Sequence, residues 1–128
     1  MRSPLVPLLQ PDSRSQLRQV LSGDVVFHSP VRDYHGRTHV AHILTTIGAV
    51  MDAIDAQADF AAGNEVVTPI TMRYQGRSMT GVLHETHDRL GRVESATLLL
   101  RPLSTLRNAI TGMQAALDRS PLPSPQIS

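Results

Sequence analysis

The sequence predicts an α+β domain in which a cone-shaped, curved antiparallel sheet wraps around a long helix and a C-terminal helix follows. Three observations lead to this fold class. A helical pattern of apolar residues occupies 37–54, a two-residue alternation replaces it up to residue 101, and a second helical pattern covers 103–118. Helices followed by consecutive strands are typical of α+β domains. A curved sheet over a helix leaves an open-ended cone that encloses a cavity.

Length and composition restrict the classes of function. The 128 residues suffice for one domain, and a net charge of +1 with scattered charges argues against nucleic acid or an anionic membrane as partner. There is no cysteine, which excludes thiol nucleophiles, and no apolar run approaches the ~20 residues of a membrane span. Without a recognisable signal peptide, we expect a soluble, cytoplasmic protein.

Both ends of the chain are rich in proline. Pro4, Pro7 and Pro11 make residues 1–12 an extended lead-in, because proline disfavours helix both at its own position and at the residue before it. Residues 119–128 form a Pro-rich tail that we expect to be disordered. A single domain over 13–118 remains between them.

The first half of this domain contains two helices and a strand. Ser13 is a plausible cap for a short helix that ends at Ser22-Gly23. The β-branched and aromatic stretch 25–28 predicts a strand that Pro30 closes. The helix over 37–54 carries one apolar stripe, made of Val40, Ile43, Leu44, Ile47, Val50, Met51 and Ile54.

Strands fill the second half. Alternation over 58–62 and 66–74 predicts two strands, and Pro69 suggests an edge position or a bulge in the second. Turns at 75–77 and 88–91 separate them from strands over 78–87 and 93–101. The final helix repeats apolar residues at core spacing, so we expect it to pack on its own domain, with a dimer contact as the alternative.

Four segments in order resemble the nuclear-transport-factor-2-like superfamily, in particular its SnoaL-like and ketosteroid-isomerase-like branch. They are DVVFHSPV (24–31), YHGR before the long helix (34–37), YQGR (74–77) and DRLGRVESATLLLRP (88–102). The resemblance covers roughly residues 13–101. It implies a hydrophobic small-molecule pocket inside the cone and a homodimer formed through the outer face of the sheet.

The resemblance does not extend to the isomerase's catalytic groups. Ser29 stands where that pattern has the general base, an Asp before the corner proline. Leu83 stands where it has a second acidic residue, and the short first helix has no Tyr. Steroid isomerisation by that mechanism is therefore not expected.

The same register predicts which side chains face the cavity. The expected ligand-pocket residues are Val40, Leu83, Ala96, Leu98 and Leu100. Glu85 is the one carboxylate expected to point inward, and burial among aliphatic groups would raise its pKa and suit it to general acid or base catalysis. Ser29 and His28 are its candidate assistants, although Ser29 also suits a hydroxyl that stabilises the corner. His87 shares a strand face with Glu85, which suggests either an acid/base pair or a polar rim.

The six histidines do not predict a metal site. His39 and His42 are three residues apart on the long helix, off its apolar stripe, and are expected to face solvent. The stretch His84-Glu85-Thr86-His87 resembles H-E-x-x-H, but its second His comes one residue early and the segment is a predicted strand. No glycine-rich phosphate loop occurs either, so we expect neither a metal nor another cofactor.

Two functions from different classes remain. One is a cofactor-independent cyclase, isomerase or dehydratase (lyase) that acts on a hydrophobic metabolite such as a polyketide or terpenoid. The other is a non-catalytic ligand-binding or dimerisation module. The fold cannot choose between them, because function depends on the site.

Overall fold

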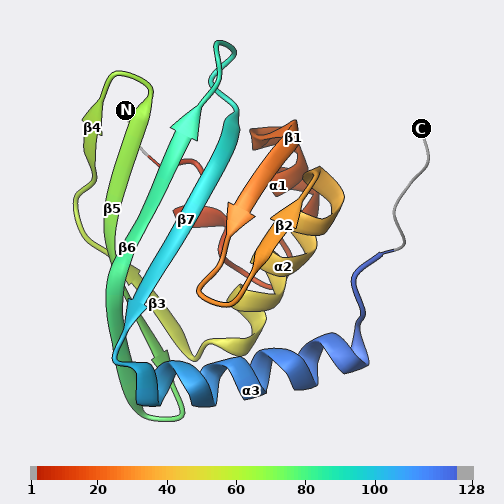
Figure 1. The fold of residues 1–128 in the computed structure, drawn as a ribbon, viewed down its shortest axis with the longest axis vertical. Helices are drawn as coiled ribbons and strands as arrows, with labels where there is room; N and C mark the ends of the chain where they lie inside the picture. Colours follow the sequence, from red (N-terminus) through yellow and green to blue (C-terminus); the bar gives the residue numbers. More distant parts are fainter. Residues whose placement is uncertain (1–2, 124–128) are drawn as a thin grey trace.

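The computed structural model describes residues 3–123, which form a curved sheet with helices on its concave side (Figure 1). The sheet has seven strands in the order β2-β1-β7-β6-β5-β3, and β4 also pairs with β5. The elements in chain order are η1 (Val6–Leu8), α1 (Arg14–Val20), β1 (Leu21–His28), β2 (Asp33–His35), α2 (Arg37–Val50), β3 (Ala53–Ala56), β4 (Phe60–Ala62), β5 (Glu65–Tyr74), β6 (Arg77–His87), β7 (Val93–Arg101) and α3 (Leu103–Arg119).

The α+β cone with a C-terminal helix is confirmed, with one difference in the sheet. Neighbouring strands are antiparallel except β1 and β7, which run parallel. No hairpin joins these two strands, because α2 and the strands β2 to β6 come between them in the chain. Their relative direction therefore depends on how the chain returns to β1, which local patterning does not predict.

The long helix ends earlier than its apolar pattern predicts. α2 stops at Val50, and β3 then pairs with β5, so Ile54 lies in a strand and its assignment to the helix was wrong. The Asp52 amide donates to the Arg73 carbonyl at 2.9 Å, and the Asp52 carboxylate accepts from the Gln75 amide at 2.6 Å. These contacts with the β5–β6 hairpin end the helix. The hairpin is distant from the helix in sequence.

Two residues adapt the sheet to its curvature and edges. Pro69 lies between the stretches where β3 and β4 pair with β5, so its missing N–H removes no ladder bond. Its carbonyl accepts from the Gln57 amide at 2.9 Å. At Gly81 the neighbouring strand approaches so closely that a Cβ would overlap the Leu99 carbonyl. Glycine at this position allows β6 and β7 to bend together.

The N-terminal segment is part of the core. The sequence predicts an extended lead-in over residues 1–12, but the described part contains the short helix η1, and Leu5 and Leu9 are buried. The backbone of Leu9 and Gln10 crosses α2 at Gly48, where a Cβ would meet it. This close crossing positions the segment over one end of the cone.

The C-terminal residues cover the outer side of α2. α3 continues to Arg119, and the imidazoles of His42 and His39 bond to the carbonyl oxygens of Ser120 at 2.8 Å and Pro123 at 2.6 Å. The expectation that His42 faces solvent was wrong, because this segment leaves it only 3% exposed. Of the predicted disordered tail, residues 124–128 lie outside the described residues.

Candidate functional site

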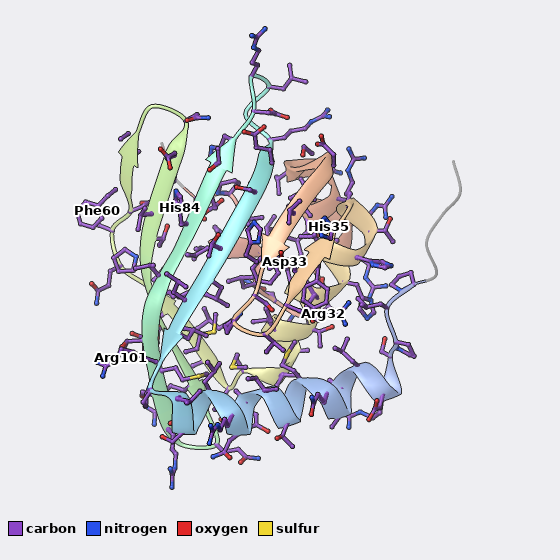
Figure 2. The ribbon with its side chains drawn as sticks, viewed as in Figure 1. Arg32, Asp33, His35, Phe60, His84 and Arg101 are labelled. Carbon is purple, nitrogen blue, oxygen red and sulfur yellow. The ribbon has the colours of Figure 1, made fainter. Side chains whose placement is uncertain are left out.

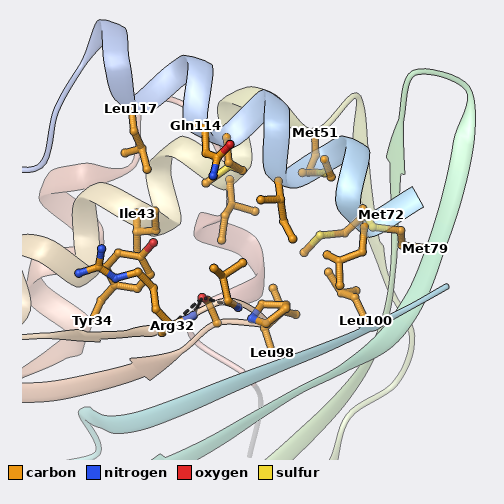
Figure 3. A pocket seen from close by; sticks show the side chains of 18 residues that line it. Arg32, Tyr34, Ile43, Met51, Met72, Met79, Leu98, Leu100, Gln114 and Leu117 are labelled. Atoms are coloured by element: carbon orange, nitrogen blue, oxygen red, sulfur yellow. Dashed lines mark hydrogen bonds between the residues drawn. The ribbon is translucent and has the colours of Figure 1, made fainter. Parts of the chain in front are cut away.

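A cavity of about 200 Å³ lies between the sheet, α2 and α3 (Figure 3). α3 runs across one end of the cone and forms one wall, while the corner between β1 and β2 forms another (Figure 1). The lining residues are Ser29, Pro30, Val31, Arg32, Tyr34, Ile43, Ile47, Met51, Met72, Met79, Leu98, Leu100, Leu106, Ala109, Ile110, Met113, Gln114 and Leu117.

The wall of the cavity is almost entirely apolar and contains four methionines. Met51 follows α2, Met72 and Met79 come from β5 and β6, and Met113 comes from α3. Methionine side chains are flexible and polarisable, and their sulfur atoms make favourable contacts with aromatic rings. Such a wall can adapt to the shape of an apolar molecule, and its sulfur atoms suit contacts with an aromatic ring.

Ser29 lies at the cavity, but its hydroxyl is engaged in the corner. It donates to the Arg32 carbonyl at 2.7 Å and accepts from the amides of Val31 at 3.2 Å and Arg32 at 3.0 Å. These three bonds close the turn between β1 and β2. The geometry matches the corner-stabilising interpretation of Ser29, because the bonds of its hydroxyl are to backbone groups of the turn.

A stack of side chains forms the polar end of the cavity. The Tyr34 ring stacks on Phe27 with the ring centroids 6.3 Å apart, and the Arg32 guanidinium lies 5.1 Å from the centre of the Tyr34 ring. Burial raises the pKa of Tyr34, which the positive charge of Arg32 partly offsets. The phenol is therefore neutral near pH 7 and can act as a hydrogen-bond donor. Gln114 points toward the cavity from α3 (Figure 3).

Glu85 is buried at the other end of the cone. It points inward as predicted and has no exposed surface, but it is not among the residues that line the cavity. It lies six positions along β6 from Met79, which corresponds to at most roughly 20 Å of strand. Among the described residues, no donor makes a well-directed hydrogen bond to either carboxylate oxygen.

The surroundings of Glu85 favour its neutral form. Burial raises the pKa of Glu85 to about 7, the nearby Ser3 side chain and Leu5 backbone oppose this, and the negative charge of Asp59 adds to it. His87 lies on the same strand face with its Nε2 3.5 Å from Glu85 Oε1, and burial lowers the pKa of this histidine. The two side chains form a buried acid/base pair beneath the N-terminal segment.

The structure brings together only part of the predicted site. Leu98 and Leu100 line the cavity beside Ser29, whereas Val40, Leu83 and Ala96 are buried in the core outside the lining. His28 lies on the opposite face of β1 from Phe27, where its Nδ1 is 2.7 Å from the Asp33 carboxylate. The predicted trio of Glu85, Ser29 and His28 is thus spread over separate places.

The remaining histidines have partners of their own. His84 lies on the outer sheet face, 2.8 Å from Glu65, and Arg14 donates to His42 Nδ1 at 2.9 Å. Within residues 3–123, no three His, Cys, Asp or Glu side chains come close enough together to hold a metal ion. The same residues include no helix that is long and apolar enough to cross a membrane.

Sequence reasoning missed Arg32, Tyr34, Gln114 and the methionine wall. One available signal was the aromatic residue next to the Ser-Pro corner. The alternation that predicts β5 also places Met72 on the same sheet face as Ile70, and the α3 stripe contains Met113. The sequence pattern does not predict the position of α3. That position determines which part of the sheet face encloses the cavity.

Comparisons with known proteins support the fold. No protein-family model and no curated protein matches the sequence. Among solved structures, a steroid delta-isomerase from Pseudomonas aeruginosa superposes with a TM-score of 0.81 at 27% identity, over 88% of this chain and 85% of that one. An uncharacterized protein with a cystatin-like fold from Silicibacter pomeroyi gives 0.85 at 19% identity, over 91% and 84%. An NTF2-like protein of unknown function from Cytophaga hutchinsonii gives 0.66 at 13% identity, over 80% and 88%.

The fold and the apolar cavity define a protein of the cone-shaped α+β class. The chain has the fold shared by nuclear-transport-factor-2-like proteins and the steroid delta-isomerase. The predicted resemblance to the nuclear-transport-factor-2-like superfamily is therefore confirmed at the level of the fold.

The buried carboxyl of Glu85 makes folding stability depend on pH. Its folded pKa of about 7 lies above the ordinary 4.5, so between these values the native state holds more protons than the unfolded chain. Stability must fall as pH rises through this window, by up to roughly 3 kcal/mol. We expect Glu85→Gln to melt roughly 10 °C above the wild type at pH 8.5 and close to it at pH 5.

Thermal unfolding from pH 5 to pH 8.5 measures this effect. The exposed carboxylate of Glu94 on β7 provides the control, because Glu94→Gln should leave the profile unchanged. His87 acts in the opposite direction, since its lowered pKa removes stability as pH falls. Equal pH profiles for the wild type and Glu85→Gln would contradict a raised pKa for Glu85.

Proposed function

We propose that this protein binds a compact hydrophobic small molecule in the cavity beneath α3 and does not act on it chemically. The observation that carries the proposal is the separation of the cavity from the buried acid. Within residues 3–123 no acidic side chain lines the cavity, and Glu85 lies toward the other end of β6. Apolar cavities with a few polar groups at one end are the usual form of small-molecule sites.

The volume of the cavity limits the size of the ligand. About 200 Å³ exceeds the roughly 150 Å³ of an apolar cavity that accepts benzene, and it falls short of the roughly 300 Å³ at which sites for drug-sized ligands begin. A ligand of one or two rings fits this range. A larger polycyclic ligand such as a steroid would require α3 to move.

Filling the cavity tests this function. Ala109 lies on α3, is buried and faces the cavity, so Ala109→Leu should occupy the space of the ligand while keeping the fold. When a ring compound that binds is present at about 100 times its Kd, we expect the wild type to gain about 2.7 kcal/mol of stability. The variant should gain none. Thermal-shift measurements with one- and two-ring hydrocarbons and their oxygenated derivatives would show this.

The control is Ala115→Leu, which adds the same side chain at an exposed position of the same helix. It should respond to ligands as the wild type does. Equal ligand-induced shifts in Ala109→Leu and the wild type would place binding elsewhere and contradict the proposal.

A second candidate function is catalysis of the isomerase, cyclase or dehydratase type on a hydrophobic metabolite such as a polyketide or terpenoid. The pKa of about 7 at Glu85, together with His87 at 3.5 Å, favours it because such a pair can accept and return a proton near neutral pH. The steroid delta-isomerase similarity at 27% identity also supports it. A substrate would have to displace the N-terminal segment to reach Glu85.

Incubation of a bound carbonyl compound with the protein in D₂O separates the two functions. The binding function predicts that the compound is recovered by mass spectrometry with no more deuterium than without protein. Catalysis through Glu85 predicts faster exchange at the carbon next to the carbonyl, with a loss of at least tenfold in Glu85→Gln. Exchange that survives this substitution would exclude Glu85 as the base.

We further infer that the protein forms a homodimer through the outer face of its sheet. An apolar row crosses three strands there, because Leu99 pairs with Val82 and Val82 pairs with Pro69. Leu99 is 58% exposed in the single chain. Apolar rows of this kind on a sheet face are suited to cover each other in a two-fold dimer.

Size-exclusion chromatography with light scattering tests the dimer. Leu99→Glu should shift the wild-type dimer toward monomer, because it places two charges into a symmetric apolar contact. Leu90→Glu serves as the control, since Leu90 is 77% exposed at the tip of the β6–β7 hairpin. A wild-type monomer at 50–100 μM would contradict the inference.

A further inference from the structure

A positive charge without an acidic partner lies at the mouth of the apolar cavity. Arg32 is exposed and lines the cavity, and no carboxylate of the described residues lies within ion-pair distance of its guanidinium. The neighbouring acid, Asp33, is engaged with His28 at 2.7 Å. The charge of Arg32 is therefore available to a bound molecule.

The guanidinium is held in place by aromatic rings. Arg32 stacks on Tyr34 at 5.1 Å, and Tyr34 in turn stacks on Phe27, which is fully buried. A cation over an aromatic ring gains about 0.5–1 kcal/mol at exposed sites. Because the stack already orders the long arginine side chain, binding an anion costs less conformational entropy than it would with a mobile side chain.

The other polar groups at this end can also donate hydrogen bonds. Tyr34 carries a neutral phenol, and Gln114 brings an amide from α3 toward the cavity (Figure 3). In Figure 2, Arg32 and Asp33 are labelled beside each other on the β1–β2 hairpin, above α3. Arginine and neutral donors together suit a carboxylate, and no acidic side chain of the described part of the chain lines the cavity to repel one.

The shape of the site separates the two ends of such a ligand. An anion deep in the apolar wall would lose its hydration without compensation, so the charged group must stay at the mouth. The methionine wall receives the hydrocarbon part, and sulfur–ring contacts favour an aromatic one. The mouth and the wall thus select an amphiphile with one charged end.

We propose that the ligand of this cavity is a compact hydrophobic carboxylate, with its carboxylate at Arg32 and Tyr34 and its ring system among the methionines. This inference rests on the proposed binding function and adds the chemical class of the ligand. Arg32 supplies the charge that distinguishes a carboxylate from a neutral molecule of the same shape. Tyr34 supplies a hydrogen bond that the carboxylate and the neutral molecule can both accept.

Isothermal titration calorimetry with matched pairs tests the inference. The probes are 2-naphthoate, cinnamate and cyclohexanecarboxylate, each compared with its neutral primary amide at pH 7. We expect each carboxylate that binds to do so roughly tenfold more tightly than its amide, a preference that weakens as salt is raised. In Arg32→Gln the preference should disappear, while the affinity for the amide stays within about twofold.

Two further variants make the result specific. Arg89→Gln removes an exposed arginine at the distant β6–β7 turn and should retain the preference. Tyr34→Phe keeps the ring stack and removes the hydroxyl, so both members of a pair should weaken. The aromatic probes should bind more tightly than the alicyclic one.

The outcomes separate this inference from the function on which it rests. If amides and carboxylates bind equally and Ala109→Leu abolishes both, the binding function stands and the carboxylate specificity is overturned. A preference that survives Arg32→Gln also overturns it. If none of the six compounds binds, the inference fails together with the compact-ligand binding function.

Discussion

The burial of the apolar face of α2 against the concave side of the sheet is the contact on which the rest of the structure depends. Val40, Ile43, Leu44 and Ile47 are nearly inaccessible to solvent there. Their burial at about 25 cal/mol per Å² favours a sheet that curves around the helix. Because α2 ends at Val50, it does not fill the whole interior. α3 covers the remaining space, and the cavity forms between them.

The same curvature separates two chemical environments. At one end the wall is apolar with donors at its rim, and at the other the N-terminal segment encloses a carboxyl group with a histidine. An ionised Glu85 would be costly inside a medium of low dielectric constant, which is why burial shifts it toward the neutral form. The segment that carries Leu5 therefore stabilises the cone by burial while it encloses a group that opposes folding at high pH.

Local patterning was sufficient for most of the elements. Alternation located β5, β6 and β7 to within a residue or two, and the Gln75-Gly76 turn adopts the positive φ angles that such hairpins require. It failed at Ile54, where an apolar residue fits a helix stripe and a strand equally well. It also missed β2, whose three residues are too few to show a period. The choice in both places depends on pairing with strands that are distant in sequence.

By itself, the sequence determined the fold class, which follows from the order of helical and strand patterns along the chain. It also determined the inward direction of Glu85 and the corner at Ser29, because each follows from the spacing of residues along one element. Only the tertiary structure decided that Glu85 lies outside the cavity and that Arg32 and Tyr34 lie at its mouth. Strand alternation states which face a side chain occupies but not what covers that face. The packing of α3 and of the N-terminal segment supplies this information, since each covers a different end of the same sheet.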